Sequence, residues 1–84
     1  MSDVPIEYSP TPRYQQLAQI LIEQIRSGEL AIGTPIPSKK VLKQAYSVAG
    51  STCDRAVDVL KEAGMVVTVP GLGLYITERK HWKS

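Results

Sequence analysis

Apolar residues recur at helical spacing in three successive stretches of the chain, and a different pattern follows them. The longest stretch, from Tyr14 to Ile25, repeats apolar side chains every three or four residues, and two shorter stretches come after it. Two runs rich in β-branched residues follow, at 65–69 and 74–77, joined by a Pro-Gly-Leu-Gly turn. The pattern predicts an α+β chain, mostly α, with three helices followed by one β-hairpin.

Capping residues predict where the first two helices begin and end. We expect Thr11 to cap the first free N–H groups and Pro12 to occupy the first turn, where its missing N–H costs nothing. Gly28 should end this helix, because glycine tolerates the left-handed conformation. Ser38 should cap the second helix, whose predicted inward-facing residues are Val41, Leu42 and Ala45.

The third predicted helix begins near Ser51. The sequence Ser51-Thr52-Cys53-Asp54 fits a capping box, in which Ser51 accepts from the Asp54 N–H and the Asp54 carboxylate reaches back. Gly64 should close this helix. Its predicted apolar face comprises Cys53, Ala56, Val57 and Leu60. Cys53 is therefore interpreted as a small core hydrophobe.

Two short helices that meet across a tight turn cannot close a core alone in so small a chain, so we expect the hairpin to cover them. This arrangement is the winged helix-turn-helix plan, whose commonest use is reading double-stranded DNA. The predicted organisation is an extended arm at 1–11, a winged helix-turn-helix domain at 12–77, and a polar C-terminal tail or linker stub at 78–84. We expect the last segment to fray.

Size and composition limit the classes of protein to which this chain can belong. A chain of 84 residues is one domain, without room for a catalytic or ligand-sensing domain beside it. The net charge of +2 permits nucleic-acid binding without arguing for it, so the distribution of charge must decide. The single Cys53 suits a reducing compartment, and no apolar run approaches the roughly 20 residues that span a bilayer. We predict a cytoplasmic protein that does not bind membranes.

The segment from Pro12 to Ile76 resembles the DNA-binding domain of the GntR family of bacterial transcriptional regulators. Five elements in order and spacing carry the resemblance: Tyr14–Ala18, Ile25–Leu30, Gly33–Ser38, Leu60–Val66 and Gly71–Ile76. The resemblance implies a sequence-specific regulator of transcription that binds double-stranded DNA, and we interpret it as a prokaryotic repressor.

The surface that reads DNA departs from the family pattern. GntR proteins usually carry Ser-Glu-Arg where this chain has Ser38-Lys39-Lys40, so Lys40 occupies the position of the phosphate-contacting arginine. The two arginines expected in the recognition helix are replaced by Gly50 and Asp54. The bidentate contact of arginine with guanine cannot be made from these positions.

Three interpretations of this departure stay open. In the first, the recognition helix is shifted so that Ser51 becomes its cap, Asp54 is structural, and Thr52 and Arg55 reach base edges. In the second, base readout is lost and the chain is a non-enzymatic interaction or architectural module, which binds a protein partner or recognises DNA shape. In the third, the wing or the termini are the main readers.

The first interpretation predicts three groups of DNA-binding residues. The second helix crosses the DNA backbone in helix-turn-helix docking, the third enters the major groove, and the wing touches adjacent phosphate or minor groove. The predicted residues are Lys39, Lys40 and Lys43, then Ser51, Thr52 and Arg55, then Thr68, Gly71, Leu72 and Gly73. Each has a purely structural alternative: the lysines form a solvated face, Arg55 pairs with Asp58 or Glu62, and the glycines only make the turn.

Other chemistry has no candidate in the sequence. No nucleophile and base form a catalytic constellation, so we predict a non-enzyme without cofactors. His81 lacks a second ligand at metal spacing, and no small-molecule site is evident. We expect weak homodimers or cooperative pairing on DNA. The candidate surfaces are the N-terminal arm, where apolar side chains alternate with other residues (Val4, Ile6, Tyr8), and two residues outside the main apolar face of the first helix, Ile20 and Ile22.

Overall fold

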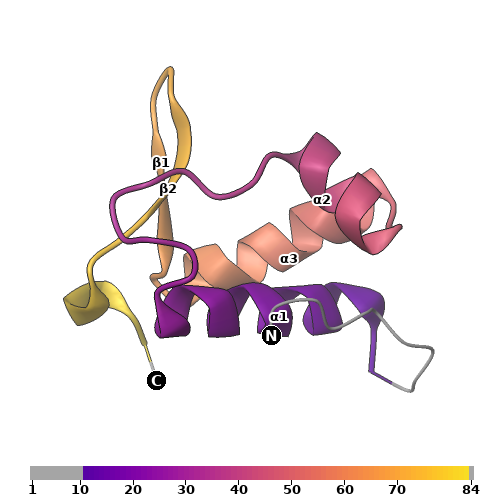
Figure 1. The fold of residues 1–84 in the computed structure, drawn as a ribbon, viewed down its shortest axis with the longest axis horizontal. Helices are drawn as coiled ribbons and strands as arrows, with labels where there is room; N and C mark the ends of the chain where they lie inside the picture. Colours follow the sequence, from indigo (N-terminus) through magenta and orange to yellow (C-terminus); the bar gives the residue numbers. More distant parts are fainter. Residues whose placement is uncertain (1–10, 84) are drawn as a thin grey trace.

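The computed structural model describes residues 11–83. Its elements in chain order are α1 (Arg13–Ser27), α2 (Lys39–Tyr46), α3 (Gly50–Glu62), β1 (Val66–Val69), β2 (Gly73–Ile76) and a short 3-10 turn, η1 (Arg79–His81). The predicted winged helix-turn-helix is therefore confirmed (Figure 1). Within 11–83, no helix is long and apolar enough to cross a membrane.

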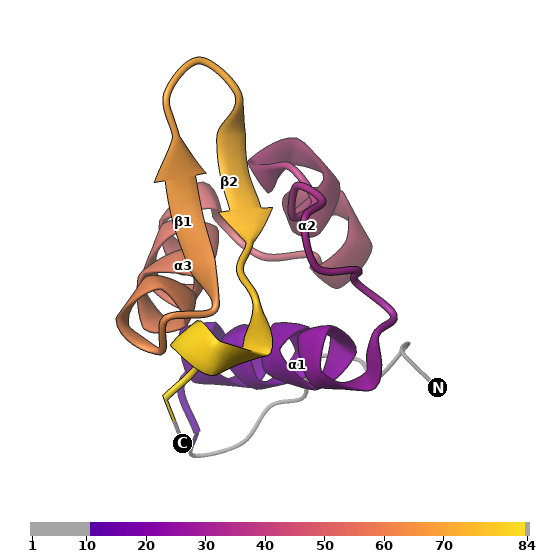
Figure 2. The ribbon, with the colours of Figure 1, turned by 90° about the vertical axis from the view of Figure 1, so that its left-hand side faces the viewer.

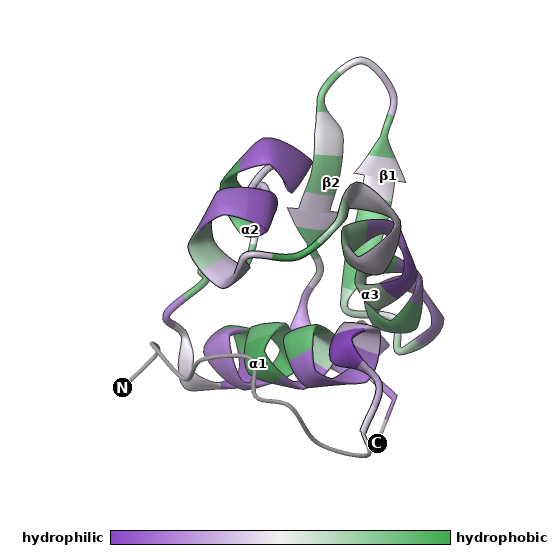
Figure 3. Cartoon of the chain, turned by 90° about the vertical axis from the view of Figure 1, so that its right-hand side faces the viewer, coloured by the Kyte–Doolittle hydropathy of each residue, from purple (hydrophilic) through white to green (hydrophobic). Residues whose placement is uncertain are grey.

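One core holds the three helices and the base of the hairpin together. Helices α1 and α2 both pack on α3, and the hairpin rises beyond the helices (Figures 1 and 2). The buried apolar residues are Leu17, Ala18, Leu21, Ile25, Leu42, Val48, Cys53, Ala56, Leu60, Met65, Val66 and Ile76. Apolar and hydrophilic segments alternate along α1, whereas α2 is mostly hydrophilic (Figure 3).

Helix α1 begins differently from the prediction and ends as predicted. The residue before its first turn is Pro12, and no side chain caps the helix, so the predicted Thr11 cap is wrong. The Pro12 carbonyl accepts from the backbone N–H groups of Gln15 (3.0 Å) and Gln16 (3.1 Å). Pro12 therefore occupies the N-cap position itself, and Thr11 lies one residue before it. At the other end, Gly28 adopts φ 88° and its N–H donates to Ile25, as expected.

Helix α2 is capped as predicted but buries fewer residues. The Ser38 hydroxyl accepts from the Val41 N–H at 3.3 Å. Only Leu42 is buried, whereas Val41 is 51% exposed and Ala45 is exposed, so two of the three predicted inward positions are wrong. The helix is only two turns long and packs on the core through one narrow stripe, which Leu42 and the half-buried Tyr46 form.

Helix α3 starts before the predicted cap. It begins at Gly50 after Ala49, whose carbonyl accepts from the N–H groups of Thr52 (3.1 Å) and Cys53 (3.2 Å). No side-chain cap is formed, so the predicted capping box is wrong. The left-handed Ser47 (φ 53°) and the buried Val48 fix the turn, so tertiary packing sets the start of this helix. Its end matches the prediction, because Gly64 adopts φ 74° just beyond the last turn.

The wing is an antiparallel hairpin tied to the segment before α2. The register pairs Val66 with Ile76 and Val69 with Gly73. Beside β2, the Ile36 N–H donates to Leu74 (3.0 Å) and the Ile76 N–H donates to Thr34 (2.9 Å). These bonds fix the wing relative to the start of α2.

The end of the chain packs on the domain instead of fraying. The Trp82 indole donates to the Thr77 carbonyl at 3.0 Å, and the Lys83 N–H donates to Ala63 at 2.8 Å. The Arg79 guanidinium donates to the Arg26 carbonyl at 3.0 Å and lies over the Trp82 ring. The expectation of fraying is therefore wrong for residues 79–83. The predicted N-terminal arm lies almost wholly outside the described residues, as do Val4, Ile6 and Tyr8.

Candidate nucleic-acid interface

The three predicted lysines of α2 all lie on its exposed surface. Lys39 is the first residue of the helix, and its ammonium lies 3.3 Å from a carboxylate oxygen of Asp54 on α3. Lys40 and Lys43 are exposed and form no ion pair with a described residue. Helix α2 therefore presents positive charge beside the first turns of α3.

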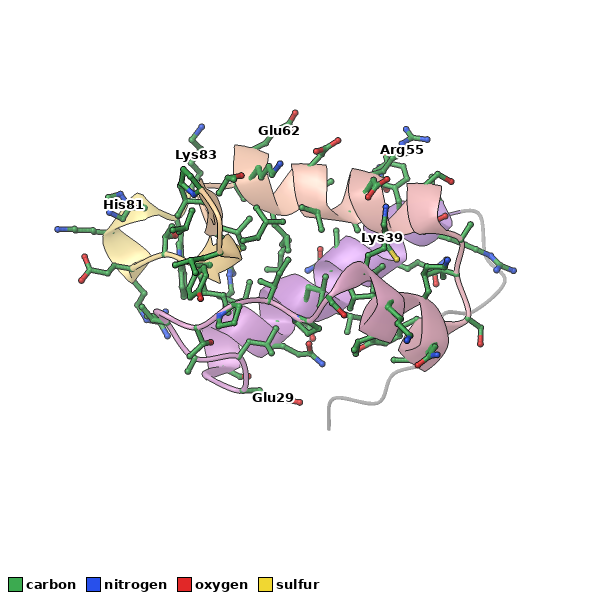
Figure 4. All side chains as sticks on the ribbon, turned by 90° about the horizontal axis from the view of Figure 1, so that it is seen from above. Glu29, Lys39, Arg55, Glu62, His81 and Lys83 are labelled. Atoms are coloured by element: carbon green, nitrogen blue, oxygen red, sulfur yellow. The ribbon has the colours of Figure 1, made fainter. Side chains whose placement is uncertain are left out.

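The predicted readers on α3 differ in how far their side chains are exposed. Ser51 is exposed, but Thr52 is half-buried. The guanidinium carbon of Arg55 lies 4.2 Å from the centre of the Tyr14 ring, so Arg55 rests against α1. Figure 4 shows Arg55 on the outer side of α3 and Lys39 at the junction of α2 with α3. The alternative, in which Arg55 forms an ion pair with Asp58 or Glu62, is wrong, because Arg55 contacts Tyr14 instead.

The start of α3 contradicts the capping roles that the shifted-helix interpretation gives to Ser51 and Asp54. Because the helix begins at Gly50, Asp54 lies in its second turn and caps nothing. Instead the Asp54 carboxylate accepts from Lys39 at 3.3 and 3.5 Å, and its side chain is 63% exposed. The sequence interpretation missed this role because the partner lies 15 residues away on another helix.

The wing tip is exposed and uncharged. Thr68, Gly71, Leu72 and Gly73 are all exposed, and Leu72 has the largest exposed fraction of the big apolar side chains in 11–83, at 68%. Gly71 (φ 79°) and Gly73 (φ 116°) have open space where a side chain would project, so the turn itself requires them. No charged residue occurs from Val66 to Thr77, so the wing can offer backbone groups, apolar side chains and uncharged polar groups such as the Thr68 hydroxyl.

A cavity of about 700 Å³ lies between α3, the segment before α2 and the wing tip. Its walls are mostly apolar, with charged side chains among them: Pro35, Ile36, Pro37, Leu42, Val57, Leu72 and Leu74 are joined by Lys39, Asp54, Asp58 and Lys61. The sequence did not reveal this cavity, because its walls come from three segments that are distant along the chain.

Cys53 is a core residue, as predicted, with 1% of its surface exposed. Burial raises the pKa of its thiol above the ordinary value, and the nearby negative charge of Asp54 raises it further. The thiol is therefore protonated at neutral pH, and packing accounts for its position on α3.

Comparison with known proteins identifies the family. The bacterial regulatory proteins of the gntR family match this chain over residues 13–76. The chain belongs to this family. The match covers the three helices and the wing, which are the elements through which a winged helix-turn-helix docks on DNA. The predicted resemblance to GntR transcriptional regulators is confirmed.

Three similar proteins illustrate what the family contains. The mannosyl-D-glycerate transport/metabolism system repressor MngR of Escherichia coli is 32% identical over 82% of this chain and 29% of its own length. YtrA of Sulfolobus acidocaldarius, a GntR-family transcription factor, has 31% identity and a TM-score of 0.80 over 90% of this chain and 81% of its own. The DNA-binding domain of AraR, solved in complex with operator ORE1, has 25% identity and a TM-score of 0.74 over 80% of this chain and 82% of its own.

The curated relatives are longer than this chain. It spans 13% to 30% of the length of the first three, two HTH-type transcriptional regulators and the repressor NagR. The similarity therefore concerns one domain of those proteins.

Proposed function

We propose that this chain binds double-stranded DNA sequence-specifically and represses transcription in the cytoplasm of a prokaryote. The observation that carries the proposal is the exposed start of α3 beside the lysines of α2, on a fold that matches GntR regulators over 64 residues, 13–76. The operator complex of the AraR domain supports it, because that domain has a similar fold over most of this chain.

The three lysines supply the attraction to the DNA backbone. Lys39, Lys40 and Lys43 occupy one short helix with no acidic residue, so the charged side chains of α2 are all positive. Ammonium groups at this helix suit phosphate contacts, which set register and affinity but carry no sequence information.

Helix α3 supplies the base contacts in this proposal. Ser51 and Arg55 are exposed, and the half-buried Thr52 lies between them along the helix. Contact with the Tyr14 ring restricts the Arg55 side chain, so less conformational entropy is lost when its outward N–H groups meet DNA. The wing, from Thr68 to Gly73, approaches the adjacent backbone or minor groove through its open glycines and Leu72.

The test is a binding titration on a selected duplex and on a random duplex of equal length at several salt concentrations. We expect the selected duplex to bind more tightly, with affinity that falls steeply as salt increases. Equal affinity for both duplexes would contradict sequence-specific binding, and no measurable binding to either would contradict DNA binding altogether.

A second candidate function is a protein-interaction module, and the apolar cavity favours it. Its two acids, Asp54 and Asp58, are matched by two lysines, so the lining has no excess positive charge to attract phosphate. Leu72 and Leu74 offer an apolar surface. A contact of this kind would depend weakly on salt, since apolar burial dominates it. The same salt series therefore separates the two functions.

Assembly on DNA is a further part of the proposal. One module reads about half a site, and an interface of roughly 600–1,000 Å² gives limited specificity alone. We propose that two copies pair weakly and cooperatively on repeated or palindromic DNA. Deleting residues 1–9 should weaken this cooperativity more than it weakens folding. A tight dimer in sedimentation without DNA, or unchanged cooperativity after the deletion, would contradict the proposed pairing.

A further inference from the structure

Asp54 is an exposed acidic residue near the start of α3, next to Arg55. The first two turns, residues 50–57, carry two charged side chains, Asp54 and Arg55. Arg55 rests over the Tyr14 ring, on the outer side of the helix. At the first position, Gly50 faces α2, because a side chain there would meet the stems of Lys39 and Lys43, at 3.6 and 3.9 Å.

Lys39 makes an exposed carboxylate tolerable beside DNA. Its ammonium donates to both oxygens of Asp54, at 3.3 and 3.5 Å, from the first residue of α2. The positive charge offsets the repulsion that phosphates exert on Asp54. The contact also orients the carboxylate, while 63% of the Asp54 side chain stays exposed and can accept further hydrogen bonds.

The chemistry of a carboxylate restricts which base edge it can contact. An ionised carboxylate only accepts hydrogen bonds, and in the major groove only the amino groups of cytosine and adenine donate them. Guanine and thymine present acceptors, which repel a carboxylate. Adenine also presents its N7 acceptor beside the amino group, whereas the cytosine amino group has no acceptor next to it on the same base.

We propose that Asp54, oriented by Lys39, accepts a hydrogen bond from the N4 amino group of a cytosine in the major groove. The proposal rests on the proposed function and adds to it the base that this position selects. Lys39 acts as a positioning residue, and its remaining N–H faces the DNA backbone. In this proposal the Asp54 carboxylate selects a base, and Lys39 offsets its repulsion of the DNA phosphates.

The test is selection from random duplexes, with the protein and two variants compared in parallel. We expect the unaltered chain to enrich cytosine at one position in each half-site. Asp54→Ala should lose that preference and keep the others. Asp54→Asn should shift it towards adenine, because an amide can both donate to N7 and accept from N6. Glu62→Ala is the matched control, since it removes an exposed acid from the other end of α3 and should leave the preference intact.

A modified base tests the same contact without changing the protein. N4-methylcytosine at the selected position replaces the amino hydrogen that faces the major groove, and should weaken binding of the unaltered chain roughly tenfold. Asp54→Ala should bind the methylated and unmethylated duplexes equally. A 5-methylcytosine duplex, which keeps the amino hydrogens, should retain most of the affinity.

The outcomes separate this inference from the proposed function. If a motif is enriched but none of its positions responds to Asp54→Ala, the contact with cytosine is wrong and sequence-specific binding stands. The same conclusion follows if Glu62→Ala changes the motif as much as Asp54→Ala does. If the unaltered chain enriches no motif, both the inference and the proposed function are overturned.

Discussion

The two helices of the helix-turn-helix differ in charge and in how firmly they are attached. Helix α2 carries three lysines and no acid, and Leu42 is its one buried residue. Helix α3 buries Cys53, Ala56 and Leu60, and its charged residues are three acids, Asp54, Asp58 and Glu62, and two bases, Arg55 and Lys61. The comparison suggests a division of roles, in which α2 supplies attraction to phosphate and α3 supplies selectivity.

The largest expected effect tests how α2 is attached. Leu42→Ala should lower the free energy of unfolding by about 2–5 kcal/mol, because it removes the buried side chain that anchors α2 to α3. Urea denaturation measures this. The neighbouring Val41→Ala, which is half-exposed, should change stability by less than about 0.5 kcal/mol. Similar losses in both variants would mean that α2 is held by more than one stripe.

The next effect tests selectivity on α3. Arg55→Ala should weaken binding to the preferred duplex by roughly 1–3 kcal/mol and relax one base position, as loss of an arginine–base contact does. Competition titrations on preferred and random duplexes measure both. Arg26→Ala, at the far end of α1, provides the matched control. An equal loss of affinity for both duplexes would mean that Arg55 contacts phosphate, as the lysines of α2 are proposed to do, and does not read a base.

A smaller effect tests the attraction assigned to α2. Lys40→Ala should weaken binding to every duplex nearly equally and reduce the slope of log affinity against log salt by about one unit, because one phosphate contact is lost. Lys80→Ala removes the same charge from η1 and should leave the slope unchanged. An unaltered slope in Lys40→Ala would exclude this residue from the interface.

The smallest effect concerns the ion pair that joins the two helices. Both partners are more than half exposed, so the contact between Lys39 and Asp54 should stabilise the fold by at most about 1 kcal/mol, and by less at high salt. A double-mutant cycle of Lys39→Ala and Asp54→Ala, followed by urea denaturation, measures the coupling. A larger coupling would mean that the pair holds α2 in place and does not only orient Asp54.

Local patterns in the sequence were sufficient to predict the scaffold of helices. The spacing of Leu17, Leu21 and Ile25 predicted the buried face of α1, and Ser38 and Gly64 marked helix ends that the structure confirms. These features depend on helical geometry and on hydrogen bonds to nearby backbone groups, so a short window of sequence contains them.

The recognition surface was predicted less well, because its features depend on contacts between distant segments. Ser51 and Asp54 fit a capping box locally, but the turn at Ser47 and Val48 starts the helix earlier and frees Asp54 for Lys39. The stacking of Arg55 on Tyr14 likewise joins α3 to α1. The sequence offers several partners for each charged side chain, and spacing alone does not rank them.

The sequence by itself determined three helices, a hairpin and the family to which the chain belongs, because periodicity and turn residues act over a few positions. The tertiary structure decided where α3 begins, which charges meet across the two helices, and that Trp82 folds back to donate to Thr77. Those outcomes depend on which surfaces remain to be buried once the helices have packed, and only the assembled chain contains that information.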